Sequence, residues 1–295
     1  MRLERASDAE KVARDRLTAA AWGRHLTGDQ FLAREAALRA HPFAVEAMDT
    51  WLWRDGSGAV LSSCETFRVP CVRDERRGHG VVIASVFTEP RLRGRGAASA
   101  MLEAVCVEAH AQGASVAALF SEVGAALYAR VGFVAQPSFD VVFPARTDPG
   151  RPCVSWDTAV AVDGAPQGTL ELTALQADWH VARERFYAQA LHRPAPATHG
   201  ARLGESACAW AASFQTNELH VLWYRFARDD EAAALIAAAR HVAQACQLTL
   251  VRFWETEPLP LGDGARVERT DELPMLRALD GGPAAWVMIH RGLWA

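Results

Sequence analysis

Residues 85–98 read Ser-Val-Phe-Thr-Glu-Pro-Arg-Leu-Arg-Gly-Arg-Gly-Ala-Ala, which predicts the end of a strand, a glycine-rich turn and the start of a helix. Pro90 ends the strand because it has no N–H to donate to a ladder. Gly94 and Gly96 have no Cβ, so the backbone there can adopt unusual dihedral angles and lie close against a ligand. The first turn of the helix adds free N–H groups and the positive end of the helix dipole. This combination predicts a binding site for an anion.

Three arginines flank the turn, Arg91, Arg93 and Arg95. Guanidinium groups bind phosphate oxygens through two parallel hydrogen bonds, so these side chains suit a diphosphate. The spacing matches neither the dinucleotide fingerprint GxGxxG nor the phosphate loop GxxxxGK[ST]. The alternative is a plain solvated turn, but a turn between a strand and a helix is the setting that a phosphate site requires. We therefore predict that the turn binds a pyrophosphate.

A second motif follows at residues 120–133, Phe-Ser-Glu-Val-Gly-Ala-Ala-Leu-Tyr-Ala-Arg-Val-Gly-Phe. Together the two stretches resemble the GNAT superfamily of N-acetyltransferases. The acetyl-CoA signature of that family, (Q/R)xxGx(G/A), is matched by residues 91–96, and its later helix, AxxxYxxxGF, is similar to residues 125–133. The resemblance covers about residues 7–143.

The resemblance implies an α+β fold with a mixed sheet and acetyl-CoA as co-substrate. It implies that the main-chain N–H of Val86 stabilises the oxyanion and that Tyr128 protonates the departing thiolate. From spacing alone Tyr128 would be a core aromatic beside Phe133, and the resemblance favours the catalytic role. Glu122 stands where many family members have an asparagine, so the cofactor contact of that asparagine is not carried over. The positions that the resemblance assigns to acetyl-CoA binding are Val86, Phe87, Thr88, Arg91, Arg93, Gly94, Arg95, Gly96 and Ala97.

A finer likeness, around residues 60–67 and 85–88, is to the fungal lysine N6-acetyltransferase family, whose members continue into a second GNAT-like lobe. It implies free lysine or a similar small amine as acceptor, which attacks directly in a ternary complex. Because a lysine-type ammonium is almost fully protonated at pH 7, some group must take its proton. Glu65, in an apolar strand expected at residues 60–69, is the predicted base. The alternatives are that Glu65 faces solvent, pairs with an arginine or orients the ammonium.

Two other functions stay open at this point. The acceptor amine could belong to a protein or peptide lysine. From a different class, the chain could be a non-catalytic CoA-binding sensor or interaction protein, in which Tyr128 and the glycines serve packing.

The chain divides near residues 143–153, where Pro144, Pro149, Gly150 and Pro152 predict a linker. We therefore expect an acetyl-CoA-binding GNAT catalytic domain at residues 1–147 and a second domain at residues 148–295. The order of elements expected before the linker is helices at 7–21 and 28–40, strands at 50–53, 60–69 and 80–87, a helix at 96–112 and a strand at 115–120.

The second half repeats this order in weaker form, with a strand expected at 220–226, a helix at 229–245 and a strand at 248–254. Pattern alone leaves open whether this reflects an internal duplication. The equivalent turn has no glycine, and Asp229, Asp230 and Glu231 open the helix. These acids complement the dipole themselves and repel a phosphate. The second half is therefore predicted to be a degenerate GNAT-like lobe that shapes the acceptor site, ending in a strand at 286–294.

The composition indicates a folded chain without the charge pattern of a dedicated nucleic-acid binder. Of 295 residues, 50% are hydrophobic and 22% charged, which excludes a mostly disordered chain. Basic and acidic residues number 18 each up to residue 149, then 13 and 17, so the net charge of −4 lies in the second half. No basic cluster marks a nucleic-acid surface. The acidic second half favours the approach of a cationic amine.

Cysteine spacing and hydropathy exclude further classes. The six cysteines lack the spacing of metal ligands or of a disulfide framework, so we expect buried thiols and no metal. The N-terminus is charged from its second residue and has no apolar signal region. The most apolar stretch, residues 232–251, is interrupted by Arg240, His241 and Gln244, which argues against a membrane span. The sequence therefore predicts a cytoplasmic protein without a membrane partner.

Overall fold

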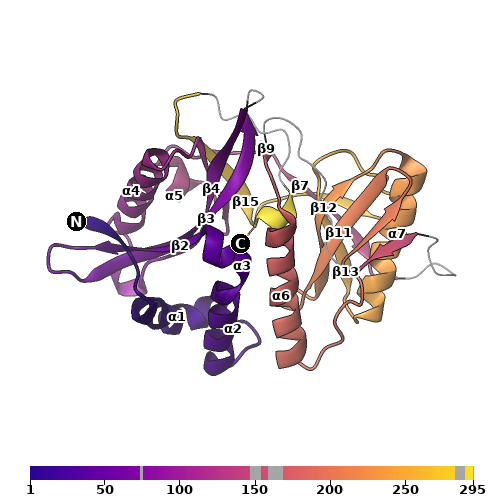
Figure 1. Ribbon diagram of the computed structural model, residues 1–295, viewed down its shortest axis with the longest axis horizontal. Helices are drawn as coiled ribbons and strands as arrows, with labels where there is room; N and C mark the ends of the chain where they lie inside the picture. Colours follow the sequence, from indigo (N-terminus) through magenta and orange to yellow (C-terminus); the bar gives the residue numbers. More distant parts are fainter. Residues whose placement is uncertain (74–75, 147–153, 159–168, 283–289, 295) are drawn as a thin grey trace.

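The structure is a computed structural model, and it describes residues 1–73, 76–146, 154–158, 169–282 and 290–294. Two lobes lie side by side, each built on one sheet, and a long helix runs between them (Figure 1). Five cysteines of the described residues are buried free thiols, as expected, and Cys153 lies outside the described residues. No helix in the described part of the chain is long and apolar enough to cross a membrane.

The first sheet is antiparallel except for one parallel pair, β4 with β5. Its strands are β1 (Arg2–Arg5), β2 (Met48–Arg54), β3 (Val60–Arg73), β4 (Arg76–Phe87), β5 (Val116–Ser121), β6 (Val134–Ala135), β9 (Thr169–Leu170) and β15 (Leu273–Ala278). The helices that belong to this lobe are α1 (Asp8–Trp22), α2 (Gly28–Ala40), α3 (Pro42–Ala47), the 3₁₀ turn η1 (Pro90–Leu92), α4 (Ala97–Ala111) and α5 (Ala126–Ala129). Because side chains alternate along a strand, Val82 joins one buried cluster, while Val81 and Ile83 join another cluster on the opposite face.

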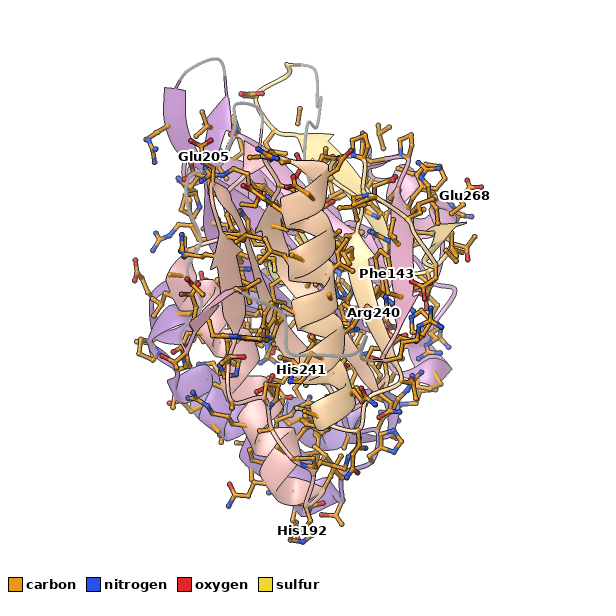
Figure 2. All side chains as sticks on the ribbon, turned by 90° about the vertical axis from the view of Figure 1, so that its right-hand side faces the viewer. Phe143, His192, Glu205, Arg240, His241 and Glu268 are labelled. Carbon is orange, nitrogen blue, oxygen red and sulfur yellow. The ribbon has the colours of Figure 1, made fainter. Side chains whose placement is uncertain are left out.

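The second sheet has the same plan, with one parallel pair, β12 with β13, in an otherwise antiparallel sheet. Its strands are β7 (Phe139–Pro144), β8 (Ser155–Asp157), β10 (Gly200–Leu203), β11 (Ser206–Ser213), β12 (Glu218–Arg225), β13 (Leu250–Trp254) and β14 (Ala265–Glu268). Helix α7 (Asp229–Ala245) connects the parallel strands and lies over the sheet (Figure 2). Arg240 of α7 donates to both oxygens of Asp263, at 3.0 and 3.2 Å, and to the Pro144 carbonyl. In both lobes, therefore, a helix joins the parallel strand pair that the described residues form.

Helix α6 (Ala174–Ala190) lies between the two sheets (Figure 1). Its Trp179 packs among the first lobe's core residues, including Phe43 and Phe67, and donates from Nε1 to the Leu38 carbonyl at 3.1 Å. Val181, on another face of α6, packs against residues of β11 and β12. The helix thus buries apolar surface from both lobes and fixes them together.

Each sheet contains a strand from the other half of the chain. β15, from the second half, pairs with β5 over six residues and separates it from β6. In return β7, which precedes the linker, pairs with β13 and β14 in the second sheet. The domain boundary predicted at residues 147/148 lies outside the described residues, and the two sheets interleave across it.

Most of the expected elements are present. The bounds expected for the helices at 28–40 and 229–245 agree with α2 and α7. The capping box of α2 forms as predicted, because Gln30 N donates to Thr27 Oγ1 at 3.2 Å and Thr27 N donates back at 2.8 Å. The strand expected at 286–294 is wrong where it can be checked, since Arg291–Leu293 forms a 3₁₀ turn, η2, and residues 286–289 are not described.

Candidate active site

The parallel strands of the first lobe separate at their carboxyl ends. β4 and β5 pair only over Val81–Ile83 and Ala117–Leu119, although both strands continue further. A bulge accompanies the separation, because the register between β3 and β4 shifts beside Ser85, which has a φ of 52°. Beyond the last pair the facing backbone groups of the two strands form no ladder. An extended ligand can therefore add between them as a further strand.

Arg14, from α1, holds the bulge in place. Its buried guanidinium donates from Nη2 to the Ser85 carbonyl at 3.1 Å and from Nε to Ser63 Oγ at 3.1 Å. It also pairs with the predicted base, because Nη1 lies 2.8 Å from Glu65 Oε1 and both side chains are buried. Pairing with an arginine is one of the alternatives that the sequence left open for Glu65. This contact favours a structural role for Glu65, and its role as a base stays a prediction.

The glycine turn leaves open space above it. Gly94 and Gly96 have φ values of 75° and 79°, and a Cβ built on either would meet no atom within 4 Å. Gly96 is the N-cap of α4, whose first helical bond runs from Ala100 N to the Gly96 carbonyl at 3.0 Å. The N–H groups before Ala100 therefore have no partner within the helix, and no acidic residue lies in its first turn. An anionic group fits this turn sterically and electrostatically.

The three arginines of the turn differ in their contacts. Arg91 is 78% exposed and pairs with Glu89 at 2.6 Å. Arg93 donates from Nε to the Thr88 carbonyl at 3.0 Å and so braces the turn, while Arg95 is exposed. Because an exposed ion pair contributes little, Arg91 can exchange Glu89 for a phosphate at small cost. Phosphate binding by the three arginines remains a prediction.

Tyr128 lies in the same buried cluster that Val86 packs against. Its ring meets that of Phe133 edge-on, with centroids 6.3 Å apart. Burial, with smaller contributions from Cys64 and Glu122, raises the pKa of Tyr128 to about 12. The phenol therefore stays protonated near neutral pH and can act only as a hydrogen-bond or proton donor to an anion. These contacts fit the core interpretation of Tyr128, and its catalytic role stays a prediction.

The corresponding turn of the second lobe is closed to an anion. Asp229, Asp230 and Glu231 occupy the first turn of α7. Glu231 accepts a hydrogen bond from Ser206 Oγ at 2.6 Å, and Asp230 pairs with Arg228 at 2.9 Å. Three acids at the positive end of a helix satisfy its dipole and repel phosphate. Only the first lobe has an open turn at this position.

The two halves of the chain match two family models. Residues 18–133 match the acetyltransferase (GNAT) family, and residues 170–295 match the LYC1 GNAT-like C-terminal domain. The chain therefore contains a GNAT-family domain followed by a LYC1-like GNAT domain. A lysine acetyltransferase of Yarrowia lipolytica (strain CLIB 122 / E 150) is 33% identical over 84 residues, 27% of this chain and 21% of the relative. The match therefore spans about a fifth of that relative's length. The two family models confirm both resemblances predicted from the sequence.

Solved structures show the same fold over both lobes. A probable N-acyltransferase from Enterococcus faecalis V583 has 12% identity and a TM-score of 0.59, covering 95% of this chain and 73% of the other. Eis1 from Mycobacterium abscessus has 14% identity and a TM-score of 0.57, covering 95% and 74%. A GCN5-related N-acetyltransferase from Kribbella flavida has 17% identity and a TM-score of 0.53, covering 95% and 72%. The chain thus has the GNAT fold, with two GNAT-like lobes.

Both strands of the opening between β4 and β5 contact tryptophan side chains from elsewhere in the chain. At the end of β4, the Phe87 ring meets the Trp22 ring edge-on at 5.9 Å. On β5, the Phe120 ring lies 4.9 Å from the ring of Trp254, which belongs to the second lobe. Trp22 lies at the end of α1 and Trp254 at the end of β13, so neither has a sequence signal that connects it to the glycine turn. The second lobe therefore reaches the β5 side of the opening.

Behind Trp254 lies a network of paired charges. The Arg291 guanidinium stacks on Trp254 at 4.6 Å and pairs with Glu272. Within the same region, Arg252 bridges Glu218 and Asp140, and Asp140 also accepts from Arg269 at 2.9 Å. Each of these carboxylates has a guanidinium partner, which offsets part of the cost of burial.

Acid should destabilise the protein through His180 of α6. Burial, followed by the charge of Arg183, lowers the pKa of His180 to about 3, and its Nε2 lies 2.8 Å from the Gly292 carbonyl. In the unfolded chain the same imidazole titrates near ~6.5, so between these pH values the unfolded state binds a proton that the folded state does not. The free energy of unfolding should therefore fall with decreasing pH, by up to about 1.4 kcal/mol per unit from this group.

Urea unfolding at pH 7, 6 and 5 tests this prediction. His180→Gln keeps an N–H donor for Gly292 and removes the titration, so its stability should depend less steeply on pH. His110→Gln, at an exposed position of α4, is the matched control and should keep the native slope. Equal slopes in the native protein and in His180→Gln would contradict the assignment.

Proposed function

We propose that the protein transfers an acetyl group from acetyl-CoA to a primary amine, by direct attack in a ternary complex. The observation that carries the proposal is the separation of β4 and β5 beside an open glycine turn at the start of α4. A strand-like pantetheine arm and an anionic pyrophosphate are the two parts of CoA that such a site suits. The match of residues 18–133 to the acetyltransferase (GNAT) family supports the same assignment.

In this proposal the chain's own groups have separate tasks. Main-chain groups of residues 86–88 bind the pantetheine arm, and the N–H groups of residues 94–97 bind the pyrophosphate with help from the arginines. The N–H of Val86 stabilises the negative charge that develops on the acetyl oxygen. The Tyr128 hydroxyl donates to the sulfur as it leaves.

The preferred acceptor in the proposal is free lysine or a similar small amine. The Yarrowia relative is named a lysine acetyltransferase, which supports a lysine-type amine as the acceptor. Acidic side chains near the end of β5 support it physically, since partial burial and the charges of Glu272 and Asp271 raise the pKa of Glu122. Carboxylates gathered this way attract an ammonium group.

Thiol release from acetyl-CoA tests the proposal against its two alternatives. Free amines of different length and charge are compared with lysine-containing peptides, and acetylated products are identified by mass spectrometry. Turnover with small amines and little with peptides is the expected result. A preference for peptides would favour a protein lysine acetyltransferase. Tight CoA binding without thiol release from any amine would favour the non-catalytic sensor.

Tyr128→Phe should reduce turnover roughly tenfold. This loss is smaller than the rate acceleration that a well-matched general acid usually provides. The effect is modest because a phenol with a pKa of about 12 is a weak acid beside a thiol at ~8.5. Acetyl-CoA affinity should stay unchanged, since the hydroxyl acts on the departing sulfur. Steady-state kinetics and calorimetry measure the two quantities. Undiminished turnover would leave Tyr128 as a core aromatic only.

A further inference from the structure

The bulge in β4 adds one residue to the strand that borders the opening. The register shifts between Ser63 and Glu65, where a step of two residues along β3 lies opposite a step of three along β4. In the described chain neither Ser85 nor Val86 has a register partner on β3 or on β5. The direction of the peptide group between these two residues therefore depends on contacts outside the two ladders.

Arg14 contacts both strands at this bulge. Its Nε donates to Ser63 Oγ at 3.1 Å and its Nη1 to Glu65 Oε1 at 2.8 Å, and these are the two β3 residues that border the register shift. Its Nη2 donates to the Ser85 carbonyl at 3.1 Å. All these donors belong to one planar group, so together they fix the Ser85 carbonyl relative to β3. Because the guanidinium is buried, the bonds are stronger than they would be in water.

The Ser85 carbonyl and the Val86 N–H belong to the same peptide group. The described chain contains no cis peptide bond, and in a planar trans peptide the C=O and the N–H point in opposite directions. Arg14 also contacts β3, so it draws the carbonyl toward the β3 side of the bulge. The Val86 N–H therefore points to the side on which β5 has separated from β4. A charged donor on the carbonyl also polarises the peptide, which makes its N–H a stronger donor.

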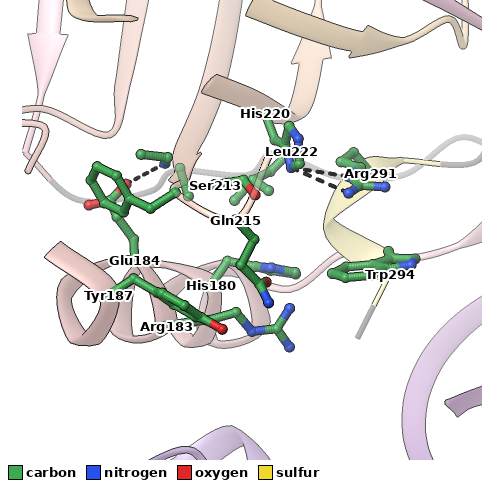
Figure 3. A pocket seen from close by; sticks show the side chains of 13 residues that line it. His180, Arg183, Glu184, Tyr187, Ser213, Gln215, His220, Leu222, Arg291 and Trp294 are labelled. Carbon is green, nitrogen blue, oxygen red and sulfur yellow. Dashed lines mark hydrogen bonds between the residues drawn. The ribbon is translucent and has the colours of Figure 1, made fainter. Parts of the chain in front are cut away.

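The second lobe fixes the end of the helix that carries Arg14. Gln215 lines a small cavity bounded by α6, by the ends of β11 and β12 and by η2 (Figure 3). Its Nε2 donates to the carbonyl of Trp22, the last residue of α1, at 3.4 Å, and Leu26 packs against the core of the second lobe. The Trp22 ring lies 6.0 Å from the Arg14 guanidinium. Both lobes therefore hold α1, and with it Arg14, in place.

We propose that Arg14 is a positioning residue for acetyl transfer, which directs the Val86 N–H toward the acetyl oxygen through the peptide that Ser85 and Val86 share. The inference rests on the proposed function, because it concerns the donor that stabilises the oxyanion of that reaction. Arg14 acts through the main chain of β4 and does not contact the reacting atoms. Its loss should lower the rate of transfer more than the affinity for acetyl-CoA, since charge develops on the oxygen only in the transition state.

Arg14→Lys tests the inference, because lysine keeps a charge beside Glu65 but lacks the planar fork that reaches all three partners. Turnover should fall roughly ten- to a hundredfold, because a misdirected oxyanion donor loses part of the ~10²–10³ that a whole donor contributes. The dissociation constant of acetyl-CoA should stay unchanged. Arg39→Lys is the matched control, since Arg39 pairs with Asp15, which follows Arg14 on α1. It should keep the native turnover.

Infrared spectroscopy of bound acetyl-CoA gives a readout that a merely structural role of Arg14 would not change. The probe carries ¹³C at the acetyl carbonyl, and the spectrum is measured without an amine. A hydrogen bond to the carbonyl oxygen lowers its stretching frequency. The frequency should therefore be lower in the native protein and in Arg39→Lys than in Arg14→Lys.

The possible outcomes separate the inference from the proposed function. An unchanged carbonyl frequency, or an unchanged turnover, in Arg14→Lys overturns the inference, even where acetyl transfer occurs. Where no amine causes thiol release, a frequency that depends on Arg14 supports the inference and refutes the transferase. Should Arg14→Lys fail to fold, the double variant Arg14→Met, Glu65→Met replaces the buried pair with apolar side chains, which proteins often tolerate. It should show the same rise in carbonyl frequency.

Discussion

Gly94→Val should weaken acetyl-CoA binding at least on the order of a hundredfold, or about 2.7 kcal/mol. In the free protein a Cβ at this position meets nothing within 4 Å, so the folded chain has room for the new side chain. That same open space is where the pyrophosphate is proposed to approach the N–H groups at the start of α4. Isothermal calorimetry with acetyl-CoA measures the loss directly.

Backbone strain is a competing cause, because Gly94 has a φ of 75° and a β-branched residue there costs about 1–2 kcal/mol. Gly58→Val is the matched control, since Gly58 has a φ of 89°, equally open surroundings and a position in the β2–β3 turn. It should lose stability and keep acetyl-CoA affinity. Gly94→Asn separates the causes further, because asparagine tolerates this conformation but still occupies the space. Native affinity in Gly94→Asn would contradict the proposed pyrophosphate position.

Local features of the site could be predicted from the sequence. The proline, the glycines and the start of α4 are determined by residues close together in the chain, and periodicity fixed the bounds of α2 and α7 within a residue. The three consecutive acids at the start of α7 likewise predicted that the turn before this helix does not bind an anion. These properties depend on backbone conformation and local charge, which short stretches of sequence specify.

Contacts between distant residues could not be predicted in this way. Arg14 was one arginine of an amphipathic helix, and nothing in its neighbourhood indicated that it would hold Ser85 and Glu65 together. Glu65 was predicted as a base in an apolar strand, whereas α1 supplies it with a buried ion-pair partner. A single sequence carries no periodic signal for such pairings.

The exchange of β7 and β15 is the largest feature that the sequence did not indicate, and it predicts how the chain can be divided. Residues 1–147 alone, the predicted catalytic domain, should fail to form a stable monomer. Without β15 the edge of β5 loses a six-residue ladder, and the sites of Met275 and Leu276, 1% and 2% exposed, become empty. Each such loss costs about 2–5 kcal/mol, against a typical domain stability of about 5–15 kcal/mol. An unpaired edge and the unpartnered β7 also favour aggregation.

A second fragment provides the matched comparison. Residues 1–136, joined through a flexible linker to residues 270–281, restore β15 beside β5 and β6 and omit β7. Size-exclusion chromatography should show a larger monomeric fraction for this fragment than for residues 1–147, although the fragment lacks β7. Urea unfolding of the fragment should also be more cooperative. If residues 1–147 instead unfold cooperatively as a monomer, with the stability of the joined fragment, then β15 contributes little to the first lobe. In that case the two lobes fold independently and the strand exchange only joins them.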